Sequence, residues 1–296
     1  MRKSLSLLVL SLAASASLTA APQRSGQATD ARTRDIYVSV VDEKGNAVTG
    51  LSAADFAVRE DGVAREVLRA VPADEPLEVI VLVDDSQAAT TAIPFIRDGL
   101  SAFADRLRDK AAIGLVTIGE RPTSVVERTT DTQAVKKGIT RIFARPGAGA
   151  YLLEGILEVT RGFQKRETRR PVIVALTVEG VEFSNQQYDR VLKALHASGA
   201  TFHALVIGTP AGGLSDEQRQ RHLVLAEGTA QTGGRREQLL TDMAIPGALA
   251  KLADELLNQY RVTYARPDAL VPPEKIQVSV TRPGATARSR TMAPGR

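Results

Sequence analysis

A short apolar run that ends in two carboxylates constrains this chain more than any other feature. Residues 79–83 are all aliphatic and are followed directly by Asp84, Asp85 and Ser86. A continuous apolar run bounded by polar turn residues is typical of a strand that is buried on both faces of a sheet. In open α/β sheets, ligands bind in the loops at the carboxyl ends of such strands. The sequence therefore predicts a parallel sheet with a functional loop at 84–91.

Strand and helix patterns alternate after this point along most of the chain. Predominantly apolar segments with a strand pattern occur at 77–83, 112–118, 171–177 and 201–207. The segments between them repeat their apolar residues with a period near 3.6 residues, as amphipathic helices do. Such alternation predicts an α/β fold over 76–259, with a doubly wound and mostly parallel sheet of Rossmann type.

The two ends of this predicted domain carry strand and turn patterns instead. We expect β hairpins over 33–75 and further strands over 260–282. Chain ends that lie close together would let these two segments pack into one small β-sandwich. Residues 283–296 are basic and contain Gly and Pro, so they are predicted to form a flexible tail.

The N-terminus is typical of an export signal. Arg2 and Lys3 precede a short apolar stretch, and small residues follow it. The stretch is shorter than the roughly 20 apolar residues that a spanning helix needs. We therefore interpret 1–21 as a signal peptide and expect a secreted or periplasmic protein; a buried N-terminal helix is the alternative. The sequence leaves open whether cleavage follows Ala16 or Ala20. No later segment is predicted to span a membrane.

Composition and missing motifs exclude several classes of protein. The chain has no cysteine, which rules out disulfides, thiolate catalysis and cysteine-ligated zinc. Its net charge of +4 falls to +2 without Arg2 and Lys3, and no basic patch contains interleaved aromatic residues, so no nucleic-acid partner is expected. The histidines lack metal-ligand spacing, and neither a P-loop nor G-x-S-x-G occurs. We therefore expect a protein that is not an enzyme.

Motifs at both ends of the α/β pattern carry a resemblance to a known family. Residues 41–62 are similar to "D-x-x-G-x-x-V-x-G-L-x-x-x-D-F-x-V-x-E-D-G", the β prelude of bacterial von Willebrand factor A-related proteins. Residues 256–264 are similar to the end of the same family's domain, and Asp84-x-Ser86 is the first half of its D-x-S-x-S metal signature. The resemblance covers residues 33–282 and implies a von Willebrand A-like domain.

The resemblance also implies a metal-ion-dependent adhesion site, of which this chain keeps only part. Asp84 and Ser86 match its first two positions, whereas Ala88 stands in place of the second serine. Ala150 stands where the family has threonine, and Glu179 where it has aspartate. Mg²⁺ needs six hard oxygen ligands in near-octahedral geometry, so a site that has lost two oxygens is predicted to be non-functional. Asp84 would then bond to loop amides. The alternative is Mg²⁺ or Mn²⁺ held by the remaining oxygens and by waters.

The predicted function is protein–protein interaction, in adhesion or envelope assembly, through the loops 84–91, 146–151 and 178–184. The candidate partner-binding residues on these loops are Asp85, Gln87, Thr90, Tyr151 and Glu182. The sequence leaves the partner and the oligomeric state open.

Three other functions remain as alternatives. The first is a binding module that retains its divalent metal. The second is an extracytoplasmic hydrolase that uses Asp84, Asp85 and Glu179 around a divalent ion, since a fold does not determine function. The third is a structural envelope component whose loops bind nothing.

Overall fold

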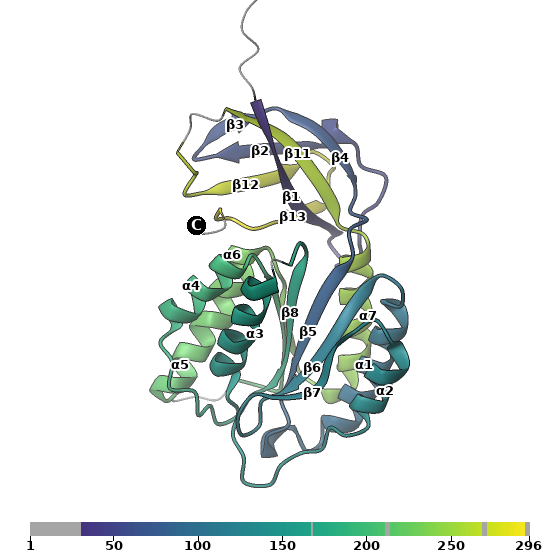
Figure 1. Cartoon of the computed structure of the whole chain (residues 1–296), viewed down its shortest axis with the longest axis vertical. Helices are drawn as coiled ribbons and strands as arrows, with labels where there is room; N and C mark the ends of the chain where they lie inside the picture. The colour runs from purple at the N-terminus through teal and green to yellow at the C-terminus, as the bar shows by residue number, and fades with distance from the viewer. Residues whose placement is uncertain (1–30, 167, 211–213, 268–270, 294–296) are drawn as a thin grey trace, which may run out of the picture.

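The chain folds into an α/β domain with a β-sandwich stacked on one end of its central sheet, as Figure 1 shows. The computed structural model describes residues 31–166, 168–210, 214–267 and 271–293. The predicted signal peptide at 1–21 lies outside these residues. Within them, no helix is both long and apolar enough to cross a membrane.

The central sheet has six strands in the order β10-β9-β8-β5-β6-β7. The parallel strands are β5 (Leu77–Val83), β6 (Ala111–Thr117), β8 (Pro171–Val178), β9 (Thr201–Ile207) and β10 (Arg236–Leu239). At one edge, β7 (Thr123–Thr129) pairs antiparallel with β6. All residues of β5 and β8 are buried, which explains why both sequences are apolar except for Glu78 and Thr177. The predicted α/β fold with a mostly parallel sheet is confirmed.

Helices cover both faces of this sheet (Figure 1). On one face lie α1 (Ile93–Arg106), α2 (Thr132–Ile139) and α7 (Ile245–Leu257). On the other lie α3 (Leu152–Arg166), α4 (Tyr188–Ser198) and α5 (Asp216–Leu223), and α5 continues through a π-helical turn, η3 (Val224–Gly228), into α6 (Thr229–Thr232). Successive residues of β5 alternate between the two cores, because neighbouring side chains of a strand point to opposite faces.

The β-sandwich is built from both ends of the chain, as predicted. One sheet has the order β13-β1-β11-β4 and consists of β1 (Ala31–Asp42), β4 (Val67–Pro72), β11 (Tyr260–Pro267) and β13 (Ala285–Arg288). The other has the order β12-β2-β3 and consists of β2 (Phe56–Glu60), β3 (Val63–Arg65) and β12 (Ile276–Val280). The two sheets share an apolar core in which the rings of Phe56 and Tyr260 lie 5.3 Å apart. Short 3₁₀ turns are η1 (Ala53–Asp55), η2 (Gln87–Ala89) and η4 (Asp242–Ala244).

The predicted flexible tail at 283–296 is wrong for its first part. Residues 285–288 form β13, which pairs antiparallel with residues 39–42 of β1. This strand has only four residues, and its apolar residues, Ala285 and Ala287, are small, so its sequence carries a weak strand pattern. Its backbone hydrogen bonds to β1 hold it in place.

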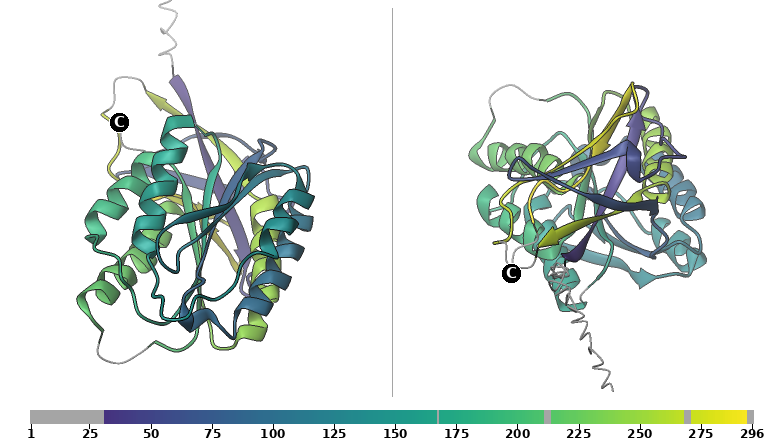
Figure 2. Two further views of the ribbon diagram at one scale, coloured as in Figure 1. Left: turned by 60° about the horizontal axis from the view of Figure 1, so that its bottom comes forward. Right: turned by 90° about the horizontal axis from the view of Figure 1, so that it is seen from above.

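The sandwich and the candidate binding loops lie at opposite ends of the central sheet. The sandwich faces the end at which β5 starts, and the loops that follow β5, β8 and β9 lie at the far end (Figures 1 and 2). The strand order changes direction between β5 and β8, because β6 lies on one side of β5 and β8 on the other. This topological switch is where open α/β sheets place their ligand sites.

Candidate functional site

Asp84 ties the end of β5 to the end of β8. Its side chain is 0 % exposed. Oδ1 accepts a hydrogen bond from the backbone N–H of Ser86 at 3.0 Å, and Oδ2 accepts from the N–H of Val178 at 3.0 Å and from the hydroxyl of Thr177 at 3.3 Å. Both oxygens therefore have donors from the chain itself, which is the amide-bonding role predicted as the alternative to metal ligation. Ser86 is also buried.

Asp85 is buried as well and serves a different loop. Its Oδ1 accepts from the N–H of Gly119 at 2.6 Å, and its Oδ2 accepts from Nε of Arg145 at 2.8 Å. A Cβ on Gly119 would lie 2.5 Å from Asp85 Oδ1, so this approach requires glycine. The carboxylate raises the pKa of Arg145, whose Nη1 also bonds to Glu120 at 3.0 Å. Asp85 anchors the loop at Arg145, and its burial corrects the prediction that it contacts a partner.

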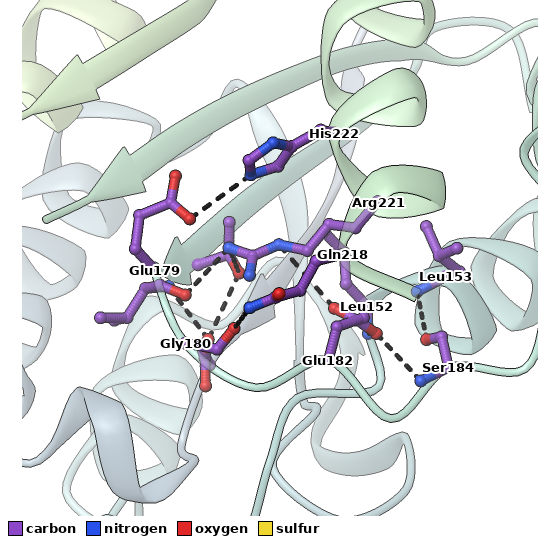
Figure 3. Close-up of polar contacts among 12 residues, drawn as sticks. Leu152, Leu153, Glu179, Gly180, Glu182, Ser184, Gln218, Arg221 and His222 are labelled. Carbon is purple, nitrogen blue, oxygen red and sulfur yellow. Dashed lines mark hydrogen bonds and ion pairs between the residues drawn. The ribbon is translucent and has the colours of Figure 1, made fainter. Parts of the chain in front are cut away.

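A buried arginine lies beside the end of β8, as Figure 3 shows. Arg221 of α5 is among the largest fully buried side chains of the described residues. Its Nη2 donates to the hydroxyl of Thr177 at 3.0 Å and to the carbonyl of Val178 at 2.9 Å. The Thr177 hydroxyl in turn donates to Asp84. One hydroxyl therefore connects the buried carboxylate of Asp84 to a permanent internal cation.

Glu182 is the counter-charge of this arginine and the cap of a helix. Its Oε2 lies 3.8 Å from Nε of Arg221, and its Oε1 accepts from the N–H groups of Leu152 at 3.1 Å and Ser184 at 3.2 Å. Leu152 begins α3, so Glu182 satisfies one of the free amides at that helix end. Burial raises the pKa of Glu182 to about 7, although the charge of Arg221 opposes the rise. Because Glu182 is buried, the prediction that it contacts a partner is also corrected.

Glu179 points toward α5, as Figure 3 shows. Its Oε2 lies 3.5 Å from Nε2 of His222, and its Oε1 is buried without a hydrogen-bond partner in the described part of the chain. Nearby, the side chain of Gln218 donates to the carbonyl of Gly180 at 2.8 Å. These contacts join the loop after β8 to α5.

The side chains at this end of the sheet do not match an octahedral metal cage. Among the described residues, no group of three or more His, Cys, Asp or Glu side chains is arranged to hold a metal ion. Asp84 has both oxygens bonded within the chain, and Glu179 faces His222. Ala88 and Ala150 supply no side-chain oxygen. An ion such as Mg²⁺ would have to displace existing hydrogen bonds to gain the ligands that it needs.

The loops 146–151 and 178–184 are joined by backbone hydrogen bonds next to this network, and they expose apolar side chains. The N–H of Ala150 donates to the carbonyl of Val181 at 2.9 Å, and the N–H of Phe183 donates to the carbonyl of Ala150 at 2.8 Å. Glu182 points inward between its neighbours, whereas Val181 is 57 % exposed and Phe183 is 49 % exposed. The rings of Phe183 and Tyr151 lie 5.9 Å apart.

The loop after β5 extends this exposed apolar area. Gln87 bonds to the neighbouring loop, since its Oε1 accepts from the N–H of Gly147 at 2.8 Å and its own N–H donates to the carbonyl of Ala148 at 3.0 Å. Ala88 is exposed, and a Cβ on Gly180 would lie 2.8 Å from its methyl group, so the two loops touch. We call Ala88, Tyr151, Val181 and Phe183 together the apolar loop surface.

Of the five predicted partner-binding residues, the structure leaves three at the surface. Gln87 and Thr90 are exposed, and Tyr151 is half-buried. Thr90 donates its hydroxyl to the carbonyl of Gln87 at 2.6 Å. Asp85 and Glu182 lie inside, because each has an arginine partner and backbone donors.

Sequence reasoning missed Arg221 and the exposed pair Val181 and Phe183. Arg221 precedes the buried Val224 and Leu225 by three and four residues, so it occupies the apolar stripe of its helix. A charged residue at such a position is a signal of a buried partner. For Val181 and Phe183, the corresponding signal is a loop in which two apolar residues lie on either side of a charged one, Glu182.

The sheet order, the covering helices and the loops define the fold of a von Willebrand factor type A domain. No protein-family model matches the sequence, and no curated protein sequence is significantly similar to it. Among solved structures, a von Willebrand factor type A protein from Catenulispora acidiphila superposes with a TM-score of 0.52 at 12% identity, over 90% of this chain and 74% of that one. Proximal thread matrix protein 1 from the mussel byssus, with a zinc-occupied MIDAS motif, superposes with a TM-score of 0.51 at 14% identity, over 67% of this chain and 49% of that one. At such low identity these likenesses show the fold alone.

Proposed function

We propose that this protein is a metal-independent protein-binding module that contacts its partner through the apolar loop surface. The fold is one that generally mediates interactions between proteins, but a fold can host many functions. The proposal therefore rests on one observation at the site, which is the outward projection of Val181 and Phe183 from a loop that Glu182 anchors in the interior.

Anchoring makes this loop well suited to binding. Glu182 bonds to the start of α3, and Ala150 bonds to both neighbours of Glu182. A loop that is already held in one conformation loses little conformational entropy when a partner binds. Exposed aromatic side chains are also typical centres of protein interfaces. Val181 and Phe183 thus offer a rigid apolar contact for an apolar side chain of a partner protein.

Arg221 supports the metal-independent part of the proposal. A divalent ion in a von Willebrand A-like site would supply positive charge close to Asp84. Here Arg221 supplies a fixed positive charge through Thr177. Affinity would then come from shape and apolar contact, not from a metal that bridges to a partner's carboxylate.

The proposal includes a location outside the cytoplasm and no enzymatic activity. The basic and apolar N-terminal pattern supports export, and adhesion or envelope assembly is the setting that we propose. Asp84 and Asp85, which a metal hydrolase would use, are buried and bonded to amides or to arginine. These contacts favour a structural role for both carboxylates.

A photo-crosslinking experiment tests the proposal in cells that produce the protein. Benzoylphenylalanine is placed at position 183, and at position 63 as a matched control, because Val63 is similarly exposed but lies in the sandwich. We expect a discrete crosslinked protein only from position 183. The purified partner should bind the Phe183→Ser variant about thirtyfold more weakly, which corresponds to about 2 kcal/mol at an interface centre. The Val63→Ser variant should bind normally.

Two results would contradict the proposal. Equal crosslinking from both positions would show that the loop surface has no preferred partner. Binding of the purified partner that disappears with chelator and returns with Mg²⁺ or Mn²⁺ would show that a metal takes part.

A further inference from the structure

A large cavity lies at the opposite end of the sheet from the apolar loop surface. It measures about 940 Å³ and lies between the sandwich and the starts of the parallel strands. Leu77, Pro171 and Thr201, at the starts of β5, β8 and β9, form one side, and Ile36 and Tyr264 of the sandwich form another. Its size is at the upper end of the range of sites for small molecules, about 300–1,000 Å³.

The lining of this cavity has an excess of positive charge. It includes five arginines but only two carboxylates, Asp35 and Glu60. The arginines are Arg34, Arg169, Arg170, Arg266 and Arg290. Glu60 is already paired, since it accepts from Arg266 Nε at 2.9 Å and from the Tyr264 hydroxyl at 2.9 Å. Among the described residues, the other four arginines form no ion pair closer than 4.0 Å.

Arg170 is a buried cation that forms no ion pair closer than 4.0 Å in the described part of the chain, although the charges of Glu75 and Asp74 act on it from farther away. Its Nη2 donates to the side-chain oxygen of Gln259 at 2.9 Å, and its guanidinium lies 5.0 Å from the centre of the Tyr37 ring. Its Nε has no hydrogen-bond partner among the described residues. Burial lowers the pKa of Arg170, so the fold bears a cost to keep this charge inside.

Arg290 is a second cation of the lining and is half-buried. Its Nη2 donates to the carbonyl of Gly199, the residue with positive φ that ends α4. Burial alone lowers the pKa of Arg290, because no carboxylate lies close enough to oppose the effect. An anion in the cavity would offset the desolvation of both guanidinium groups.

The walls also have an apolar part. Tyr37, Tyr264 and Ile36 come from the sandwich, and Pro272 and Pro273 come from the segment before β12. Rings and aliphatic surface of this kind accommodate the body of an organic molecule, while a few charged groups fix its orientation.

We propose that this cavity binds a small organic anion, in which a carboxylate, sulfonate or phosphate group is attached to an aromatic or aliphatic body. The anionic group lies among the unpaired arginines, and the apolar body lies against the tyrosines and prolines. The site is separate from the apolar loop surface and does not depend on the function proposed for that surface.

A pair of fluorescent dyes tests this proposal on the purified protein. Anilinonaphthalene sulfonate carries an aromatic body and one negative charge, and N-phenylnaphthylamine has the same rings without the charge. We expect one saturable site for the sulfonate, at least tenfold weaker binding of the neutral dye, and an affinity for the sulfonate that falls with added salt.

Three substitutions locate the dye. Arg290→Gln and Arg169→Gln should each weaken binding of the sulfonate about tenfold, or about 1.4 kcal/mol. Arg169 is exposed and makes no contact that the fold needs within the described residues, so its loss should not unfold the protein. Arg282→Gln is the matched control, because Arg282 is exposed and does not line the cavity. Unchanged thermal unfolding confirms that each variant is folded.

Several outcomes would overturn the proposal. Absence of saturable binding, or equal affinity for the two dyes, would exclude an anion site. Binding that survives both cavity substitutions but is lost in Phe183→Ser would place the dye on the apolar loop surface.

Discussion

The buried carboxyl of Glu182 should make the folded state less stable as pH rises from about 4.5 to about 7. Burial raises the pKa of Glu182 from 4.5 to about 7 in the folded protein. Between these values the folded state holds a proton that the unfolded state has released. The stability from this group is therefore complete below pH 4.5 and is lost as pH rises through 7. At about 1.4 kcal/mol per pH unit, the total is about 3 kcal/mol.

Glu182→Gln isolates this effect because glutamine does not titrate. Its side-chain oxygen can still accept from the N–H groups of Leu152 and Ser184. The free energy of unfolding is measured by urea denaturation of both proteins between about pH 4 and pH 8. The free energy of unfolding of the variant minus that of the wild type should increase by about 3 kcal/mol across this range. The contributions of all other titrating groups cancel in this difference. Glu158→Gln, at an exposed position of α3, should show no such trend.

A difference that stays constant with pH would refute the reasoning. It would mean that Glu182 is ionised throughout in the folded state. The attraction between Glu182 and Arg221 would then exceed the desolvation cost of the buried carboxylate.

The other expectations concern His203, the response to divalent metal ions and the role of Asp84. His203 is fully buried, and burial lowers its pKa from 6.5 to about 4, so stability should fall by about 3 kcal/mol as pH drops from 6.5 to 4. The free energy of unfolding of His203→Gln minus that of the wild type, measured by urea denaturation, should therefore rise by about 3 kcal/mol as pH drops through this range, because the opposite trend of Glu182 cancels in the difference; a difference that stays constant with pH would contradict it. The midpoint of thermal unfolding should not change when chelated protein receives millimolar Mg²⁺, Mn²⁺ or Ca²⁺, and a saturable rise would contradict the metal-independent proposal. Asp84→Ala should lower the free energy of unfolding by about 3 kcal/mol with or without metal, because it leaves the N–H of Val178 unpaired in the interior; a loss that appears only with added metal would contradict the structural role.

Much of the fold could be predicted because burial leaves a direct pattern in the sequence. Strands covered on both faces, such as β5 and β8, have almost entirely apolar sequences. The edge strand β7 lacks this pattern, since Val126 is its one buried residue. Strand β13 has no buried residue and is recognised only by its pairing with β1. Strands that depend on a distant partner leave little trace in their own residues.

The site was harder to predict because charge suggests exposure. Asp85 and Glu182 were expected at the surface, yet both are buried. Their cationic partners are far away in sequence, since Arg145 lies 60 residues beyond Asp85 and Arg221 comes from α5. Local sequence cannot reveal such pairs. Asp84 was different, because its position at the end of a fully buried strand already suggested bonds to loop amides.

The position of β1 between β11 and β13 has a consequence for how the chain folds. The first strand of the described chain pairs with β11 and β13, which lie near its other end, and the N–H of Leu51 donates to the hydroxyl of Tyr260 across 209 residues. Contacts of such high sequence separation form slowly, because a long loop must close before any of them forms. The α/β domain, whose parallel strands join through short helical connections, is therefore expected to form first. Its formation brings the start of β11 next to the end of β4, where Tyr260 pairs with Pro72, and β1 is then among the last strands to acquire its neighbours.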